Sequence, residues 1–269
     1  MMFMTAVTIF GGMMMASFYP TVLVHGIGGD ISDMIDIQNT LNSYGVKTFT
    51  LEIGNGKLDS IFWNMNKQCE TLNAKIGNLE LKDEKINLLG VSQGGLLARC
   101  YVERYAHQTK EVHSLITYGT PHMGIYLSWI ELKNLEYWKD PFHFDAYLAN
   151  NDFLVYINNE NPHAQSKQYR SNLLSLNHFL IAWSSIDSVI SPLESSKFEF
   201  YNISLVKERK ELQVVPLGQS DYYKDDILCL RTLNNTGRLN IKEFPCQHEE
   251  FKHEKCFENG LMNITLLLL

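Results

Sequence analysis

The chain has 269 residues, of which 45% are apolar and 20% are charged, enough to build a large buried core. Its formal net charge is −7 and it contains no cluster of lysine and arginine, so it lacks the usual phosphate contacts of nucleic-acid-binding proteins. The same charge balance excludes docking on anionic lipid by electrostatics alone. We expect one large α/β domain with no nucleic-acid partner.

The first eighteen residues carry no charge and contain an apolar run. We interpret residues 1–18 as a secretory signal peptide, with the small residues Ala16 and Ser17 near the cleavage point, and residues 19–269 as the mature domain. A basic segment is missing at the start, so a buried N-terminus is the alternative. No other run reaches the ~20 apolar residues of a membrane-spanning helix, so no transmembrane span is expected. Three N-glycosylation triplets fit a secretory route: they begin at Asn202, Asn234 and Asn263.

Five cysteines occur without a C-x-x-C pair, which argues against a zinc site or a redox motif. If the chain is secreted, one or two disulfides can form, and the pairs we consider are Cys69 with Cys100 and Cys246 with Cys256. The alternative is five buried small apolar side chains.

Short apolar runs bounded by turn residues predict six strands. Helix-period segments lie between several of them, for example at residues 96–105. Strands that alternate with helices are typical of a mostly parallel central sheet flanked by helices. The predicted strands are Val22–Val24, Val46–Leu51, Ile86–Leu89, Leu115–Tyr118, Phe179–Trp183 and Leu239–Ile241.

An insertion at about residues 126–178 is crowded with aromatic side chains in its first two thirds. Regular α/β units do not need so many, so we predict a helical insertion that caps an apolar site. Extra surface helices packed on the sheet are the alternative. The aromatic residues are Tyr126, Trp129, Tyr137, Trp138, Phe142, Phe144, Tyr147, Phe153 and Tyr156.

The sequence Gly90-Val91-Ser92-Gln93-Gly94 fits the G-x-S-x-G pattern of a nucleophilic serine. A buried strand precedes it and a helical pattern follows, so the serine falls on a sharp strand-to-helix turn. Such a turn exposes the hydroxyl at a helix N-terminus, where backbone N–H groups can stabilise an oxyanion. We predict that Ser92 is a nucleophile; a structural turn serine is the alternative.

A nucleophilic serine of this kind needs an acid and then a histidine, in that chain order. Asp187 follows an apolar strand and lies in a polar loop at its carboxyl end, where catalytic residues of parallel sheets gather. It is our predicted acid. Four other aspartates are also candidates for the acid, and the alternative for each is that it is a solvated surface charge: Asp145, Asp152, Asp221 and Asp226.

His248 is the predicted general base because it lies in a loop directly after a strand-like stretch. His253 is its nearest competitor, and we interpret it as a surface histidine. His122 precedes the acid in the chain, so we interpret it as structural.

An oxyanion hole should use two backbone donors. One is the N–H of Gln93, directly after the nucleophile. The other should come from the glycine-rich loop after the first strand, where we choose the N–H of Ile27. His25 is expected to brace this loop or to be an ordinary buried histidine.

The chain resembles the palmitoyl-protein thioesterases, which are lysosomal α/β-hydrolases. The segments "VLVHGIGGD", "GVSQGG", "DSVISPLESSKFEFY" and "LGQSDYYKDDILCLRTLNNTGRL" appear in the family's order. The resemblance extends from about residue 21 to residue 248. It implies the α/β-hydrolase fold, with Ser92, Asp187 and His248 as the triad and Ile27 and Gln93 as oxyanion donors.

The resemblance implies hydrolysis of the thioester between a long fatty acid and cysteine in S-acylated proteins or peptides, in the lysosome, with no metal or cofactor. Two alternatives use the same fold and triad: a carboxylester lipase and an acyl-CoA thioesterase. A third alternative, of another class, is a non-catalytic acyl-chain-binding protein.

Three features depart from the family pattern. The stretch "GTPHMG" replaces a glutamine-rich segment, and Tyr105 replaces a half-cystine on the helix after the nucleophile. Paired cysteines after the first strand are also absent. These departures leave the triad intact and bear on disulfide pairing and substrate choice.

Overall fold

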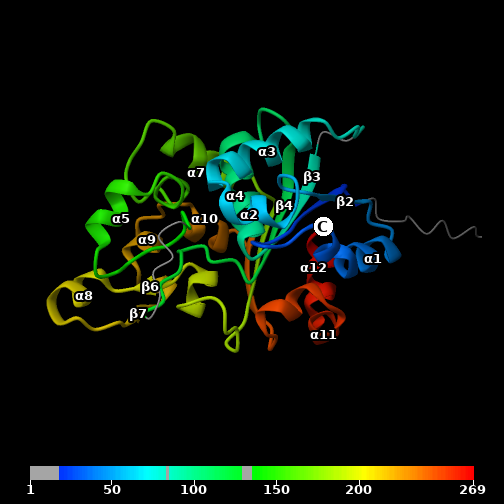
Figure 1. Ribbon diagram of the computed structural model, residues 1–269. Coiled ribbons are helices and arrows are strands. Elements are labelled where there is room, and N and C mark those ends of the chain that lie inside the picture. The colour runs from blue at the N-terminus through cyan, green and yellow to red at the C-terminus, as the bar shows by residue number, and fades with distance from the viewer. Residues whose placement is uncertain (1–17, 83–84, 129–134) are drawn as a thin grey trace, which may run out of the picture.

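A six-stranded parallel sheet forms the centre of the computed structural model, which describes residues 18–82, 85–128 and 135–269 (Figure 1). The strand order is β2-β1-β3-β4-β5-β8. All six predicted runs are strands, and the prediction of a mostly parallel sheet flanked by helices is confirmed. The strands are β1 (Thr21–Val24), β2 (Thr48–Leu51), β3 (Lys85–Val91), β4 (Glu111–Tyr118), β5 (His178–Trp183) and β8 (Leu239–Glu243).

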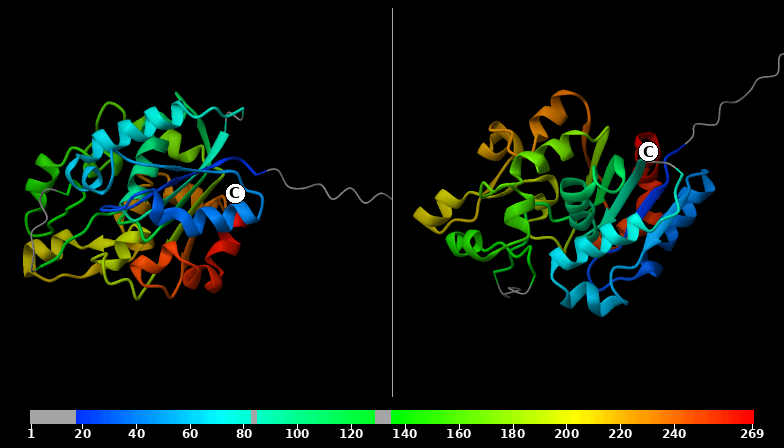
Figure 2. Two further views of the ribbon diagram at one scale, coloured as in Figure 1. Left: turned by 45° about the vertical axis from the view of Figure 1, so that its right-hand side comes forward. Right: turned by 90° about the horizontal axis from the view of Figure 1, so that it is seen from above.

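Helices cover both faces of the sheet because the strands are apolar on both sides. On one face, α1 (Ile35–Ser43) and α12 (Met262–Leu268) pack on a core that includes Leu23 and Leu89. On the other face, α3 (Met65–Gly77) and α4 (Gln93–Tyr105) pack on a core that includes Leu88. Two views of the ribbon show these layers (Figure 2).

Two long segments, here called excursions, leave the sheet and return to it between its last three strands. The first lies between β4 and β5 and contains α5 (Phe144–Asn150), α6 (Leu154–Ile157) and α7 (Ser166–Leu174). The second lies between β5 and β8 and was not predicted from the sequence. It holds the small antiparallel pair β6 (Phe200–Tyr201) and β7 (Val214–Val215), with α8 (Ile203–Arg209), α9 (Asp221–Lys224) and α10 (Leu230–Asn235).

Several aromatic side chains of the first excursion belong to the hydrophobic core. Tyr137, Trp138, Tyr147 and Phe153 are buried and are part of the cluster that packs on the sheet. The abundance of aromatic residues therefore reflects the packing of the excursion on the domain. Trp129 and residues 1–17, which include nearly all of the predicted signal peptide, lie outside the described residues.

The remaining short helices lie in loops. Two of them, α2 and the turn η4, border the edge of the sheet described below. They are η1 (Ile31–Met34), α2 (Lys57–Phe62), η2 (Leu193–Lys197), η3 (Leu217–Gln219), η4 (His248–Lys252), α11 (Glu254–Cys256) and η5 (Phe257–Leu261).

Both of the cysteine pairs considered from the sequence are disulfides. Cys69 and Cys100 join α3 to α4, and Cys246 and Cys256 join the segment after β8 to α11. The fifth cysteine, Cys229, is buried outside any disulfide. The Cys69–Cys100 link thus fastens α4, the helix that follows Ser92, to α3.

Two of the C-terminal leucines belong to the core. Leu268 and Leu269 are buried against the face covered by α12. Within the described ranges, no helix is both long enough and apolar enough to cross a bilayer.

A pair of buried charged groups lies on α4, the helix that follows the predicted nucleophile. Arg99 and Glu103 are both fully buried, and Arg99 Nε lies 3.7 Å from Glu103 Oε1. Arg99 also donates a hydrogen bond of 2.6 Å to Asn158 Oδ1 in the first excursion. Burial raises the pKa of Glu103 from its ordinary value of 4.5 to about 8, although Arg99 lowers it.

Because of this raised pKa, the free energy of unfolding should fall as the pH rises. Between about pH 4.5 and pH 8 the folded state keeps a proton on Glu103 that the unfolded state has lost, so this group lowers the free energy of unfolding as the pH rises. The slope is at most about 1.4 kcal/mol per pH unit.

Urea denaturation at several pH values tests this effect. We expect Glu103→Gln to gain stability relative to the wild type as the pH rises through this window. Glu208→Gln, at an exposed position of α8, is the control and should follow the wild type. Parallel curves for wild type and Glu103→Gln would contradict this account.

Candidate active site

Ser92 occupies a strained turn between β3 and α4. Its backbone angles are φ 55° and ψ −126°, a conformation that non-glycine residues rarely adopt. Its N–H donates to Tyr118 O at 2.8 Å, which ties the turn to the end of β4. The turn places the side chain at the carboxyl edge of the sheet, as the G-x-S-x-G pattern predicts.

Glycines make this turn possible by allowing backbone contact. A Cβ atom on Gly94 would lie 2.3 Å from Val24 O, and one on Gly90 would lie 2.3 Å from Gly94 O. A Cβ on Gly95 would lie 1.9 Å from Thr120 Oγ1. No side chain fits at these positions, so the glycines around Ser92 are required by the close approach of α4 to the strands.

Asp187 and His248 are buried and hydrogen-bonded to each other. Asp187 lies in the loop after β5, and its Oδ2 is 2.7 Å from His248 Nδ1. The other oxygen, Oδ1, accepts from the N–H groups of Val189 and Ile190 at 2.8 and 3.1 Å. These bonds fix the carboxylate, and the carboxylate fixes the imidazole, as an acid–base pair requires.

Ser92 and His248 face the same cavity, which has a volume of about 90 Å³. Among the described residues, Ser92 Oγ has no hydrogen-bond partner, so the bond between Ser92 and His248 that the triad expectation called for is not formed in this structure. The cavity lining also includes Gly26, Ile27, Val189 and the charged residues Asp33, Glu249 and Lys252.

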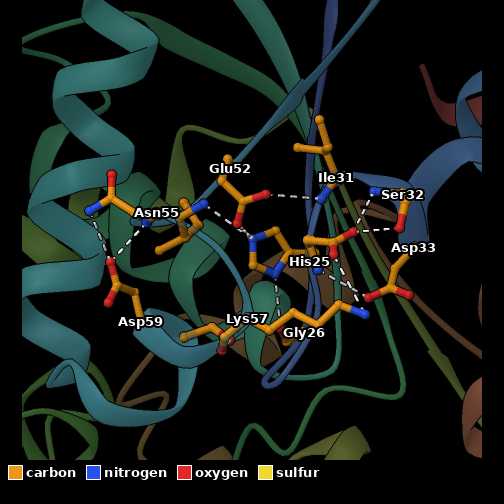
Figure 3. A network of polar contacts seen from close by, with 12 residues as sticks. His25, Gly26, Ile31, Ser32, Asp33, Glu52, Asn55, Lys57 and Asp59 are labelled. Atoms are coloured by element: carbon orange, nitrogen blue, oxygen red, sulfur yellow. Dashed lines mark hydrogen bonds and ion pairs between the residues drawn. The ribbon is translucent and has the colours of Figure 1, made fainter.

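Of the two interpretations left open for His25, the structure supports the one in which it braces the loop after β1 (Figure 3). The N–H of Ile53 donates to His25 Nε2 at 3.1 Å, which leaves the ring proton on Nδ1, 2.9 Å from Gly26 O. Glu52 Oε2 accepts from the N–H of Ile31 at 3.2 Å. The buried imidazole and the carboxylate together hold residues 25–31 against the β2–α2 segment.

Two backbone N–H groups are available beside the cavity. Neither the Ile27 nor the Gln93 amide donates to any of the residues that the structure describes. Ile27 lines the cavity, and Gln93 is the first residue of α4, directly after Ser92. Unpaired amides at such positions can bind a developing negative charge.

Most rivals of the predicted acid are surface groups, and one is not. Asp145, Asp152 and Asp221 are exposed, in line with their alternative interpretation. Asp226 is buried, so its interpretation as a solvated charge was wrong. It accepts from Arg170 Nη2 at 2.9 Å and from the hydroxyl of Thr232, and it thereby ties the second excursion to α7.

His253 and His122 lie where the sequence interpretation put them, the first at the surface and the second in the structural interior. His253 is exposed and pairs with Asp36 at 2.7 Å. His122 is fully buried, stacks on Phe198 with 4.4 Å between ring centroids, and makes a 3.0 Å hydrogen bond to Thr117 Oγ1. Burial lowers the pKa of His122 well below its usual range.

Some polar residues of this region were not singled out from the sequence. Asp33, Glu249 and Lys252 border the cavity, and Ser60 and Gln68 lie behind the oxyanion loop. Only Glu249 carried a signal, because it follows His248 in the chain. In the part of the chain that the structure describes, no group of three histidine, cysteine or acidic residues is arranged to hold a metal ion.

Comparisons with known proteins relate the chain to a family. The family model described as palmitoyl protein thioesterase matches residues 20–133 and 126–248. Palmitoyl-protein thioesterase 3 of Dictyostelium discoideum is 32% identical over 92% of this chain and 91% of its own length. Lysosomal thioesterase PPT2 of Mus musculus is 28% identical over 83% of this chain and 79% of its own length.

Solved structures of α/β-hydrolase type have the same fold. The lipase BlEst2 of Bacillus licheniformis covers 93% of this chain and 92% of its own, at 14% identity and a TM-score of 0.52. The hydrolase olei00960 of Oleispira antarctica covers 93% and 90%, at 15% identity and a TM-score of 0.50. At these identities the likeness concerns the fold alone. The family model and the relatives that span nearly the whole chain show that this protein belongs to the palmitoyl-protein thioesterase family.

Proposed function

We propose that this protein hydrolyses long-chain fatty acyl thioesters, such as S-palmitoyl groups on the cysteines of proteins or peptides. Membership of the thioesterase family supports the reaction class. The observation that carries the assignment of residues is the Asp187–His248 hydrogen bond, whose histidine faces the same cavity as Ser92.

The proposed mechanism is acyl transfer in two steps. His248 takes the Ser92 proton as Ser92 Oγ attacks the thioester carbonyl, and the Ile27 and Gln93 amides bind the oxyanion. The thiolate leaves and receives the proton from His248. Water, deprotonated by His248, then releases the fatty acid and restores Ser92. Asp187 keeps the imidazole oriented and stabilises its protonated form.

The long acyl chain must extend beyond the reacting centre. A cavity of about 90 Å³ accommodates the thioester and its neighbouring atoms, not a long chain. The aromatic residues of the first excursion that the structure describes do not line this cavity, so the lining gives no support to our expectation that the excursion caps an apolar site there. Each methylene that is buried on binding contributes about 0.8 kcal/mol, so any apolar surface near the mouth can add to affinity.

We place the activity in the lysosome, reached by the secretory pathway. The relatives named lysosomal thioesterases support this location. The predicted signal at residues 1–18 and the three glycosylation triplets are in line with it.

Removing the proposed base should abolish turnover. With a palmitoylated cysteine peptide as substrate, we expect His248→Ala to lower kcat by at least about 10³-fold, because Ser92 then has no proton acceptor. His253→Ala is the matched control, since it also removes a histidine paired with an aspartate but lies outside the cavity. Equal kcat values for these two variants would contradict the role of His248.

A substrate comparison tests the proposed reaction against its alternatives. We expect kcat/KM for a palmitoyl thioester to exceed that for p-nitrophenyl palmitate by about tenfold or more, as a thioesterase that positions an acyl thioester should show. The measurement is initial rates under identical detergent conditions. A clear preference for the oxygen ester would indicate a carboxylester lipase, and a preference for palmitoyl-CoA over the acyl peptide would indicate an acyl-CoA thioesterase. Acyl-chain binding without any turnover would indicate the non-catalytic alternative.

A further inference from the structure

The short helix α2 contacts both sides of the proposed oxyanion hole through one residue, Ser60. The N–H of Gly28 donates to Ser60 Oγ at 2.8 Å, and Ser60 Oγ donates to Lys57 O at 2.7 Å. From the other side, Gln93 Nε2 donates to Ser60 O at 2.9 Å. Ser60 is only 2% exposed, so water does not replace these bonds.

A second buried amide strengthens the link to Gln93. Gln68, on α3, accepts from Gln93 Nε2 at 3.0 Å through its Oε1 and donates to Ser60 O at 3.2 Å and Trp63 O at 2.8 Å. Gln68 and Gln93 are each 1% exposed. The Gln93 amide nitrogen thus donates to two buried acceptors, which orient its side chain.

Polar bonds, and not apolar packing, determine where α2 lies. Two of its apolar side chains, Leu58 and Phe62, are 67% and 77% exposed. Its N-cap, Gly56, has φ 123° and gives no side-chain cap. Asp59 Oδ2 accepts from the N–H of Asn55 at 2.8 Å and so closes the loop in front of the helix (Figure 3). Lys57 adds an ion pair with Asp30 at 3.5 Å, which is exposed and of little energetic weight.

The hydrogen bond at Gly28 orients the peptide unit that directly follows Ile27. Gly28 has φ 65°, and a short loop with this backbone can rotate its peptide planes unless a partner holds them. With Gly28 N–H turned toward Ser60, the Ile27 amide remains beside the cavity with no partner among the described residues.

We propose that Ser60 is a positioning residue that holds the two oxyanion donors, Ile27 and Gln93, in register with each other. Its hydroxyl fixes the loop that carries Ile27, and its carbonyl fixes the side chain of Gln93. Ser60 touches no reacting atom in this scheme. The inference rests on the proposed function and adds to it the residue on which preorganisation of the hole depends.

The test is Ser60→Ala, which removes the hydroxyl and keeps the carbonyl. Loss of one oxyanion donor costs about 10²–10³ in kcat, and a donor that is only misplaced should cost about 10–100-fold. We expect kcat to fall by that factor with KM for a palmitoyl thioester nearly unchanged, because the oxyanion exists only after attack. The inhibition constant of a long-chain alkyl trifluoromethyl ketone, which forms an oxyanion with a nucleophilic serine, should rise by a similar factor.

The matched control is Ser114→Ala. Ser114 is also fully buried and its hydroxyl also donates to a backbone carbonyl, Leu268 O at 2.5 Å, but it lies on β4 near the opposite edge of the sheet. Ser60→Thr keeps the hydroxyl and should recover most of kcat. If Ser60→Ala does not fold, Ser60→Cys keeps the shape of the side chain with a weaker acceptor and should show a smaller loss of the same kind.

The outcomes separate the inference from the function on which it rests. Wild-type protein that neither turns over thioesters nor binds the ketone overturns both. An active wild type with Ser60→Ala indistinguishable from Ser114→Ala, or with an effect on KM alone, overturns the positioning role and leaves the proposed function standing.

Discussion

The strained turn at Ser92 is the constraint on which the rest of the site depends. It requires that α4 start directly at the end of β3, which is possible only because Gly90, Gly94 and Gly95 permit contacts that any Cβ would block. The cost of the strained backbone is of order 1–3 kcal/mol, and the packing of α4 against the sheet and the Cys69–Cys100 disulfide hold it in place. The same geometry sets Gln93 at the helix N-terminus, so one turn carries both the proposed nucleophile and a proposed oxyanion donor.

The remaining groups reach this turn from separate parts of the chain because parallel strands end at one edge. Asp187 follows β5 and His248 opens η4 after β8, and their bond is buried with both carboxylate oxygens satisfied. The loop after β1 is held by His25 on one side and by Ser60 on the other. Glu103 on α4 is fully buried and its pKa is raised to about 8, so its effect on the free energy of unfolding is more favourable at acidic than at neutral pH. This pH dependence is in keeping with the proposed lysosomal location.

The sequence predicted the parts of the fold that local patterns encode. Six apolar runs became six strands, and the glycines around Ser92 identified the turn because they have a steric reason to be there. The choice of Asp187 and His248 followed from chain order and strand ends, and the structure brings these two together.

The parts that were missed depend on contacts between distant residues or on very short elements. The second excursion was missed because β6 and β7 have two residues each and its helices are short, so the sequence shows no clear strand or helix period there. Asp226 was misjudged because burial depends on Arg170, which lies far away in the chain. Ser60 and Gln68 carry no motif, and only the folded chain shows that they meet Gly28 and Gln93.

The central claim is that Ser92 is an activated nucleophile, and covalent labelling tests it most directly. Tryptic cleavage releases residues 86–99 as a peptide in which Ser92 is the only hydroxyl-bearing residue. After treatment with a long-chain fluorophosphonate, we expect mass spectrometry to find a single phosphonyl adduct on this peptide, and none when Ser92 is replaced by alanine. An adduct on another peptide, or no adduct on folded protein, would contradict the account.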